Sequence, residues 1–265
     1  MTAAPNEPVL LRRDEGRVAI LTLNRPQAMN ALSGELIDAL QAEFDRLAKD
    51  REIRCVIIEA QGARAFSTGH DLREVASTRD YAFHHALLTR CSAMMISIKH
   101  LPQPVIAKVQ AIATAAGCQL VAACDLAVAS SDATFATSGI NNGLFCGTPS
   151  VSVGRNVGSK RALDMLFTGQ PIDAATALRD GLVSRVVPPA ELDRETMAFA
   201  QHIAAQPPQQ IAEGKVMFHK HMTMELDQAY AYATEFMAGA IQREDAQAGI
   251  DAFVNKKPKP EWKGR

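Results

Sequence analysis

The chain has 265 residues, of which 47% are hydrophobic and 22% charged, and its formal net charge at pH 7 is -1. This composition is ordinary for a globular protein with a sizeable core, and the near-zero charge gives no general attraction to nucleic acid or to an anionic membrane. No apolar run reaches the roughly 18 residues that a membrane-spanning helix needs. Residues 1–16 lack the apolar core of a signal peptide and the Arg- and Ser-rich pattern of a transit peptide.

The cysteines and histidines give no sign of disulfides or of a metal site. The five cysteines form no C-x-x-C pair and lie mostly inside apolar segments, which favours reduced, buried thiols. The adjacent histidines 84–85 diverge on a helix, and those at 219 and 221 do not share a helical face. We therefore expect a cytoplasmic protein that binds no metal, no nucleic acid and no membrane.

Short apolar strands alternate with amphipathic helices along the first two thirds of the chain. Strands are predicted at 17–24, 55–60, 105–113 and 126–130, from apolar runs rich in β-branched residues. A helix capped by Ser33 follows the first strand, and another is predicted over 82–99. Nearly continuous apolar strands separated by helices indicate an α/β fold whose sheet is covered on both faces.

The strand pattern stops near residue 190, and the rest of the chain is predicted to be helical. Four helical segments cover 191–205, 208–222, 226–242 and 244–256. The expected organisation is a core over 1–195 and a C-terminal helical region over 196–265. The second of these is long enough to pack on a neighbouring chain.

Three loops follow three of the predicted strands and carry the features of a site. They are "NRPQAMNAL" after the first strand, "AFSTGHDLREV" after the second and "ATAAGCQ" after the third. Loops that leave the same ends of neighbouring strands converge on one crevice. Two of them carry small residues before a helix start, so two backbone N–H groups are expected to point at one oxygen and stabilise negative charge on it.

These loops, in this order and spacing, resemble the crotonase (enoyl-CoA hydratase/isomerase) superfamily. The matching stretches are "LNRPQAMNAL", "AFSTGHDL" and "AAGCQLVAACDLAVAS", and the resemblance continues to the final "GIDAFVNKKP". It implies a spiral of ββα turns, a C-terminal helical region that forms trimers or hexamers, and an acyl-CoA thioester as ligand. Coenzyme A would then be part of the substrate, with no separate cofactor.

The resemblance also assigns residues to the site. The two N–H groups of the oxyanion hole belong to His70 and Ala116. Four positions fall where family members line the pantetheine and adenine of coenzyme A, namely Leu32, Thr68, Asp71 and Leu72.

The hydratases of this family use two glutamates, and this chain has neither. Gln119 stands at the first position and Gly139 at the second. Glutamine can orient a water molecule but cannot transfer its proton, and a positioned acid or base contributes typically 10²–10⁴-fold to a rate. Within the superfamily the pattern most resembles the enoyl-CoA hydratase domain-containing type 3 group, through "GHDL", "AAGCQLVA" and "GLFC".

Two other side chains were considered as substitutes for the glutamates. His70 titrates near neutrality, although its backbone N–H alone is the simpler role. Cys146 lies near the water-binding position and would be a nucleophile only if its pKa were lowered. The sequence therefore predicts an enoyl-CoA hydratase-like protein with weak or altered chemistry on an acyl-CoA. The alternative is a non-catalytic acyl-CoA-binding or regulatory subunit.

Overall fold

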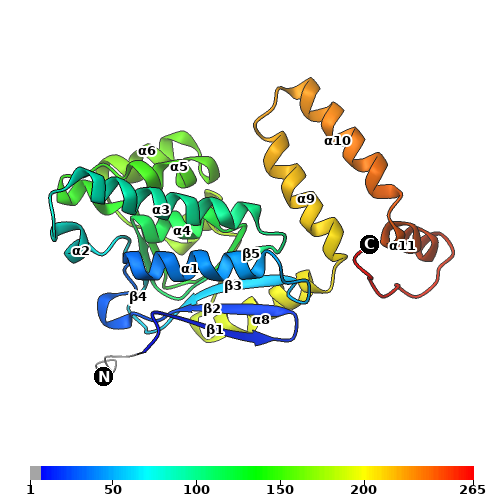
Figure 1. Ribbon diagram of the computed structural model, residues 1–265, viewed down its shortest axis with the longest axis horizontal. Coiled ribbons are helices and arrows are strands. Elements are labelled where there is room, and N and C mark those ends of the chain that lie inside the picture. Colours follow the sequence, from blue (N-terminus) through cyan, green and yellow to red (C-terminus); the bar gives the residue numbers. More distant parts are fainter. Residues whose placement is uncertain (1–6) are drawn as a thin grey trace.

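The computed structural model describes residues 7–265 and places a six-stranded sheet between helices on both of its faces (Figure 1). The strand order is β1-β2-β3-β5-β7-β10, and every pairing is parallel except the antiparallel β1–β2 hairpin. The expected α/β core with a covered sheet is confirmed. Residues 1–6, which belong to the stretch searched for a targeting signal and to the predicted core, lie outside the described residues.

The main sheet contains β1 (Leu10–Glu15), β2 (Val18–Leu23), β3 (Cys55–Ala60), β5 (Val105–Val109), β7 (Leu126–Ser130) and β10 (Arg185–Val187). A second sheet contains β4 (Ala65–Ser67), β6 (Ile112–Thr114), β8 (Thr134–Ala136) and β9 (Ile172–Asp173). The first seven α-helices are α1 (Gly34–Leu47), α2 (Leu72–Ala76), α3 (Tyr81–His100), α4 (Ala116–Ala123), α5 (Gly147–Asn156), α6 (Ser159–Thr168) and α7 (Ala174–Arg179). The last four are α8 (Leu192–Ala204), α9 (Pro208–His221), α10 (Leu226–Ile241) and α11 (Glu244–Val254).

Alternation along the strands explains why both faces of the main sheet are covered. In β3, Val56 and Ile58 join the large cluster that includes α1 and α3, whereas Cys55 and Ile57 pack with residues of α8. Successive side chains of a strand point to opposite faces, so a strand that is apolar throughout needs helices on both sides. The predicted cap of α1 is confirmed, because the Ser33 side chain accepts a hydrogen bond from the N–H of Leu36 at 3.3 Å.

The predicted strand over 105–113 is wrong in one respect, because the chain divides there into two strands. β5 belongs to the main sheet and β6 to the second one. Gln110 marks the turn between them, and its amide donates to the carbonyls of Gly62 at 2.9 Å and Ala65 at 3.0 Å. Strand pairs divided between two sheets and followed by a helix are the repeated ββα turns that the resemblance implied.

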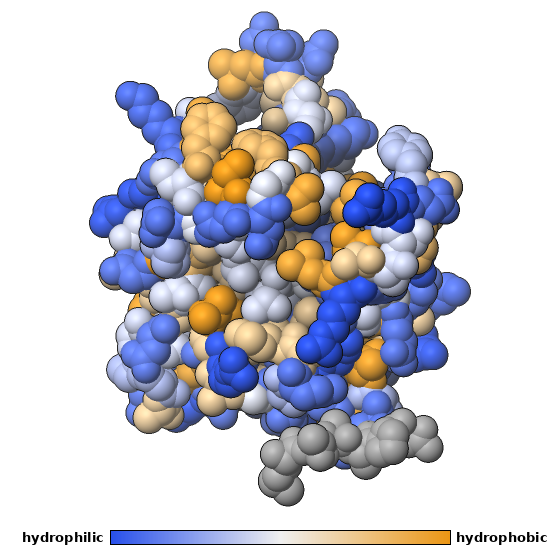
Figure 2. All heavy atoms as spheres, turned by 90° about the vertical axis from the view of Figure 1, so that its left-hand side faces the viewer, coloured by the Kyte–Doolittle hydropathy of each residue, from blue (hydrophilic) through white to orange (hydrophobic). Residues whose placement is uncertain are grey.

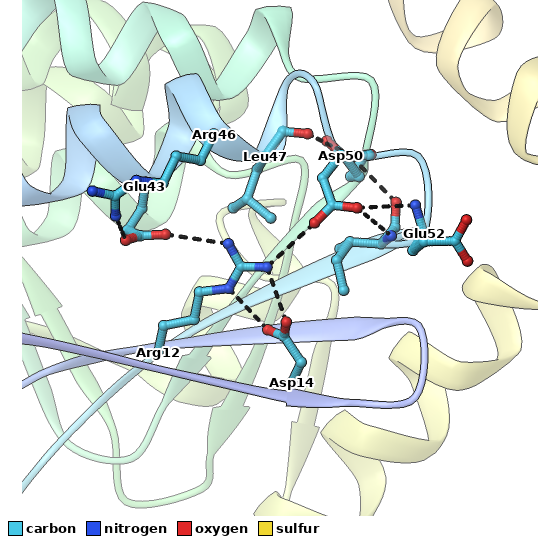
Figure 3. A network of polar contacts seen from close by, with 9 residues as sticks. Arg12, Asp14, Glu43, Arg46, Leu47, Asp50 and Glu52 are labelled. Atoms are coloured by element: carbon cyan, nitrogen blue, oxygen red, sulfur yellow. Dashed lines mark hydrogen bonds and ion pairs between the residues drawn. The ribbon is translucent and has the colours of Figure 1, made fainter.

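Arg12 ties the first strand to the helix that covers it (Figure 3). Its guanidinium donates two hydrogen bonds of 2.9 Å to Asp14 and also contacts Glu43 at 3.3 Å and Asp50 at 3.4 Å. Asp50 in turn accepts from the backbone N–H of Glu52 at 2.9 Å. This network fixes the edge hairpin against the end of α1, on the side of the sheet away from α8.

All four C-terminal helices are found where they were predicted, but they do not behave as one unit. α8 crosses residue 196, the predicted boundary, and packs on the main sheet, whereas α9 to α11 extend away from it (Figure 1). Lys215 attaches α9 to the core, because its buried ammonium donates to Asp125 at 2.6 Å and to the carbonyl of Ile98 at 2.8 Å.

Many apolar side chains of α9 to α11 are left without cover. Met237 is 52% exposed and Phe253 is 87% exposed. Within residues 7–265 no helix has both the length and the apolar character needed to cross a bilayer.

Candidate functional site

The loops after β2 and β4 are joined by a short parallel bridge between Leu32 and His70. The N–H of Leu32 donates to the carbonyl of Gly69 at 2.7 Å, and the N–H of Asp71 donates to the carbonyl of Leu32 at 3.2 Å. The carbonyl of Gly69 and the N–H of Asp71, on either side of His70, thus both point toward Leu32. In such a ladder the N–H of His70 itself points to the other side, and it has no acceptor among residues 7–265.

On that other side lies the first turn of α4. A β-carbon placed on Gly69 would lie 2.8 Å from the β-carbon of Ala115 and 2.9 Å from the backbone nitrogen of Ala116. Only glycine permits this approach, and Gly69 also has a positive φ of +89°. Ala116 is the first residue of α4, so its N–H is one of the groups that a helix leaves unpaired. The two amides that were predicted to form a pair therefore lie on neighbouring, closely packed loops.

Ala115 is a feature of the site that the sequence did not predict. Its φ of +50° and ψ of -122° lie in a region that non-glycine residues rarely adopt. Its N–H donates to the carbonyl of Ala136 at 3.0 Å, which holds the turn against β8. Strained backbone of this kind clusters at functional sites, and here it sets the direction of the next N–H, that of Ala116. Nothing in an alanine signals a positive φ, so no pattern would have found it.

The small residues of "AAGCQ" allow another segment to approach the backbone closely, as their size predicted. A β-carbon on Gly117 would lie 2.1 Å from the carbonyl oxygen of Ser67, so only glycine lets α4 pack on β4. Ser67 is completely buried, and its hydroxyl donates to the carbonyl of Asn30 at 2.8 Å. The three predicted loops thus meet at the start of α4.

Several buried polar atoms around these loops have no partner within residues 7–265. They include the Oε1 of Gln119, both ring nitrogens of His70 and the hydroxyl of Thr137. Gln119 lies in the first turn of α4 and is 3% exposed. Thr137 follows Ala136 directly and was missed in the sequence analysis. Unpaired buried polar groups are costly, and a ligand with complementary groups would satisfy them.

Both ring nitrogens of His70 are buried, although the role proposed for this residue uses only its backbone N–H. Burial lowers the pKa of its imidazole below 6.5, so the ring is neutral near pH 7. Asp71 and Glu74, the nearby carboxylates, have structural partners. Asp71 caps α2 and pairs with Arg25 at 2.8 Å, which holds its pKa below the usual value, and Glu74 accepts from the N–H of Gly34 at 2.8 Å.

Gly139 and Cys146 lie against each other, and the contact explains why residue 139 has no side chain. The N–H of Gly139 donates to the sulfur of Cys146 at 3.2 Å. A β-carbon on Gly139 would lie 2.7 Å from that sulfur and 2.8 Å from the carbonyl oxygen of Leu144. The thiol occupies the space into which a side chain at 139 would extend. Burial raises the pKa of Cys146, the opposite of what a nucleophilic thiolate requires.

The four residues expected to line coenzyme A differ in their exposure and in their hydrogen bonds. Leu32 is fully buried and contributes its backbone, and the hydroxyl of Thr68 donates to the carbonyl of Met29 at 3.4 Å. Asp71 is occupied as a helix cap, whereas Leu72 is 54% exposed. Figure 2 faces this side of the molecule and shows apolar side chains among polar ones, several of them in the upper half, where α5 and α6 lie.

Two exposed aromatic residues lie close together, one just before α5 and one in α6. Phe145 and Phe167 are 51% and 63% exposed, and their ring centroids are 6.3 Å apart. No cluster of three metal-ligating side chains is present in the part of the chain that the structure describes.

Comparison with known proteins agrees with this geometry. A sequence model described as enoyl-CoA hydratase/isomerase matches residues 13–265. The human enoyl-CoA hydratase domain-containing protein 3, mitochondrial, is 43% identical over 255 residues, which cover 96% of this chain and 83% of that protein. The short-chain-enoyl-CoA hydratase of Clostridium acetobutylicum is 31% identical over 254 residues, 95% of this chain and 96% of that one. A crystal structure of an enoyl-CoA hydratase from Mycobacterium smegmatis superposes with a TM-score of 0.94 at 49% identity, covering 97% and 99% of the two chains.

These relatives contradict one prediction and confirm another. The expected cytoplasmic location is wrong as judged by them, because the human, mouse, rat, Xenopus laevis and zebrafish proteins of the type 3 group are all named as mitochondrial. The expectation had been drawn from the reduced, buried cysteines and from the lack of a transit-peptide pattern in residues 1–16, and these features did not identify the location. The resemblance drawn from the three loops is confirmed: this chain belongs to the enoyl-CoA hydratase/isomerase family.

Proposed function

We propose that the chain binds an acyl-CoA thioester and holds the thioester oxygen between the backbone N–H groups of His70 and Ala116. One observation carries the proposal: both N–H groups lack an acceptor within residues 7–265, and Gly69 packs the two loops together so that they adjoin. Preorganised donors of this kind stabilise negative charge as it develops on an oxygen. The apolar surface around Phe145 and Phe167 suits an acyl chain or a pantetheine arm.

The proposed reaction is hydration or isomerisation of an enoyl thioester at a rate well below that of an ordinary hydratase. Gln119 replaces one carboxylate and Gly139 the other, and the neutral imidazole of His70 is buried without partners. Binding without turnover is the second candidate. The contact between Gly139 and Cys146 favours it, because this contact fills the space of the second carboxylate.

We further propose that the chain assembles as a homotrimer or a hexamer through α9 to α11. Their exposed apolar side chains, Phe253 and Met237 among them, are too many for a monomer surface to leave in water. Light scattering at micromolar concentration should give the mass of a trimer or hexamer, and a single monomeric species would refute this part.

The test of the site compares binding of crotonyl-CoA with binding of free coenzyme A by calorimetry. Ala116→Pro removes one N–H at the first position of a helix, where proline is tolerated. It should weaken crotonyl-CoA binding while leaving binding of free coenzyme A nearly unchanged. Ser159→Pro, at the first position of α6, is the matched control.

Turnover is tested by incubating the unmodified protein with enoyl, hydroxyacyl and malonyl thioesters and analysing the products. A product supports the enzyme, and binding with no product supports the second candidate. Equal weakening of both ligands by Ala116→Pro, in a protein that is still folded, would refute the assignment of the amide.

A further inference from the structure

A cavity lies at the opposite end of the main sheet from the amides of His70 and Ala116. Its volume is about 730 Å³, and it is bounded by the β1–β2 turn, the residue before β3, the end of α8 and the C-terminal tail. β2 and β3 run parallel, and the cavity borders their first residues, whereas the proposed thioester site follows their last ones. A strand of this length spans about 20 Å, so the two sites are separate. The cavity at the start of β2 and β3 is lined by Arg17, Arg54, Gln201, Lys259, Glu261 and Trp262, among others.

Three cations line this basic cavity without a carboxylate partner. Arg17, Arg54 and Lys259 form no ion pair within residues 7–265, whereas the nearby Arg12 and Arg13 each pair with carboxylates. The Nε of Arg54 is buried and has no hydrogen-bond acceptor in the described part of the chain. Burial, together with the charge of Arg17, lowers the pKa of Arg54, while the charges of Glu52, Asp245 and Glu261 oppose this shift.

Two carboxylates, Glu15 and Glu261, also line the cavity and offset part of the charge of its three cations. Glu15 already accepts a hydrogen bond from Arg13 at 3.3 Å, and Glu261 forms no ion pair in the described part of the chain. Neither carboxylate bonds to Arg54. An anion that enters the cavity would therefore meet free donors on the arginines.

The outer wall is the C-terminal tail, which is fixed in place by a buried carboxylate. Asp245 is 3% exposed, accepts from the N–H groups of Lys263 and Gly264 at 2.8 Å each, and donates its own N–H to the carbonyl of Arg265 at 3.0 Å. Trp262 lies beside Gly249 of α11, where a β-carbon would be 3.2 Å from the indole ring. Trp262 lines the cavity beside the cations, and the ammonium of Lys259 lies over its ring, 5.3 Å from the centroid.

We propose that the basic cavity binds a nucleoside diphosphate, with its phosphates on Arg17, Arg54 and Lys259 and its base against Trp262. Arginine pairs bidentately with phosphate oxygens, and aromatic side chains stack on bases. The volume is in the range of small-molecule sites. The same chemistry is carried by a free nucleotide and by the nucleotide end of a second coenzyme A.

The chain supplies its own reporter, because Trp262 is its one tryptophan. ADP, coenzyme A, adenosine and inorganic phosphate are titrated into the full chain while the tryptophan fluorescence is recorded. ADP should change the fluorescence in a saturable way and bind more tightly than adenosine or phosphate alone. A matching response to coenzyme A would identify its nucleotide end as a ligand, and a response to ADP alone would identify the free nucleotide.

Variants separate the cavity from non-specific charge. Arg54→Gln should weaken ADP binding about tenfold or more, the loss expected for a charged hydrogen bond. Arg51→Gln is the matched control, because Arg51 is exposed in the same loop and does not line the cavity. Lys259→Gln on the tail gives a second test that does not disturb the sheet. No fluorescence response to millimolar ADP, or equal affinities in the Arg54 and Arg51 variants, would overturn the proposal.

Discussion

Carboxylates can be introduced at positions 119 and 139, where the proposed function lacks them, and the contact between Gly139 and Cys146 determines how. Gln119→Glu needs no new space, since the side chains are of equal size and the Oε1 of Gln119 is unpartnered. Gly139→Glu on its own places a β-carbon 2.7 Å from the sulfur of Cys146, closer than real contacts allow. The conformation of Gly139 is not an obstacle, because its φ is not positive, but the carbonyl oxygen of Leu144 would lie 2.8 Å from the same β-carbon and has to shift as well. We therefore predict that Gly139→Glu requires Cys146→Ala as a partner.

The expected gain follows from the chemistry of the two carboxylates. A positioned acid or base contributes about 10²–10⁴-fold, and groups that act as a unit are not additive. The triple variant Gln119→Glu, Gly139→Glu, Cys146→Ala should hydrate crotonyl-CoA at least about 10²-fold faster than the unmodified chain. Gln119→Glu alone should gain much less. At 3% exposure, a carboxylate at 119 would have a raised pKa, as a general acid near neutral pH requires.

The assay is the loss of enoyl-thioester absorbance, with folding checked by circular dichroism. Cys146→Ala alone is the control for loss of the thiol, and it should not accelerate hydration. Fast hydration by the unmodified chain would refute the premise that proton transfer is missing. A Gly139→Glu single variant as fast as the triple variant would show that the thiol does not obstruct residue 139.

Two further predictions concern stability. Lys215→Met should lower the free energy of unfolding by about 3–5 kcal/mol in urea titrations, because it leaves Asp125 buried without its cation; restoration of part of the loss by adding Asp125→Asn would confirm the cause, and an unchanged midpoint for Lys215→Met would contradict it. His70 has a folded pKa below 6.5, so the unfolded chain takes up a proton first and stability falls as the pH drops below about 6.5. His70→Leu should remove that part of the acid sensitivity, and an equally steep loss of stability in the variant would show that another group causes it.

The sequence predicted the long elements well because their signals are local. The helical period of α1 and its cap at Ser33 depend on residues within a few positions of one another, as do the apolar runs of β3 and β7. Strands of three residues, such as β4, β6 and β8, are too short to show a period. Their pairing is set by neighbours that are distant in sequence, so the second sheet was not predicted.

The sequence predicted which loops lie together at the candidate site, but it did not predict the contacts between their residues. The loops with Gly69 and Ala116 were placed together by their positions after neighbouring strands, and the structure confirms that they adjoin. The positive φ of Ala115 and the sulfur of Cys146 against Gly139 arise from packing between segments. A single sequence contains no signal for such contacts.

Backbone geometry and side-chain chemistry contribute separately to the proposed function. The two N–H groups proposed to hold the thioester oxygen belong to the backbone, so their placement depends on how the loops pack and not on the chemistry of neighbouring side chains. Proton transfer depends on side chains, and in the proposed function Gln119, which cannot transfer a proton, stands where the resemblance implies a glutamate. Gly139 and Cys146 add a second barrier, because the thiol fills the space where a carboxylate would extend. The proposed function therefore separates binding of a thioester oxygen, which uses backbone groups, from hydration of an enoyl thioester, which uses side chains. The Ala116→Pro variant tests thioester binding, and the triple variant tests hydration, so the two properties can be measured separately.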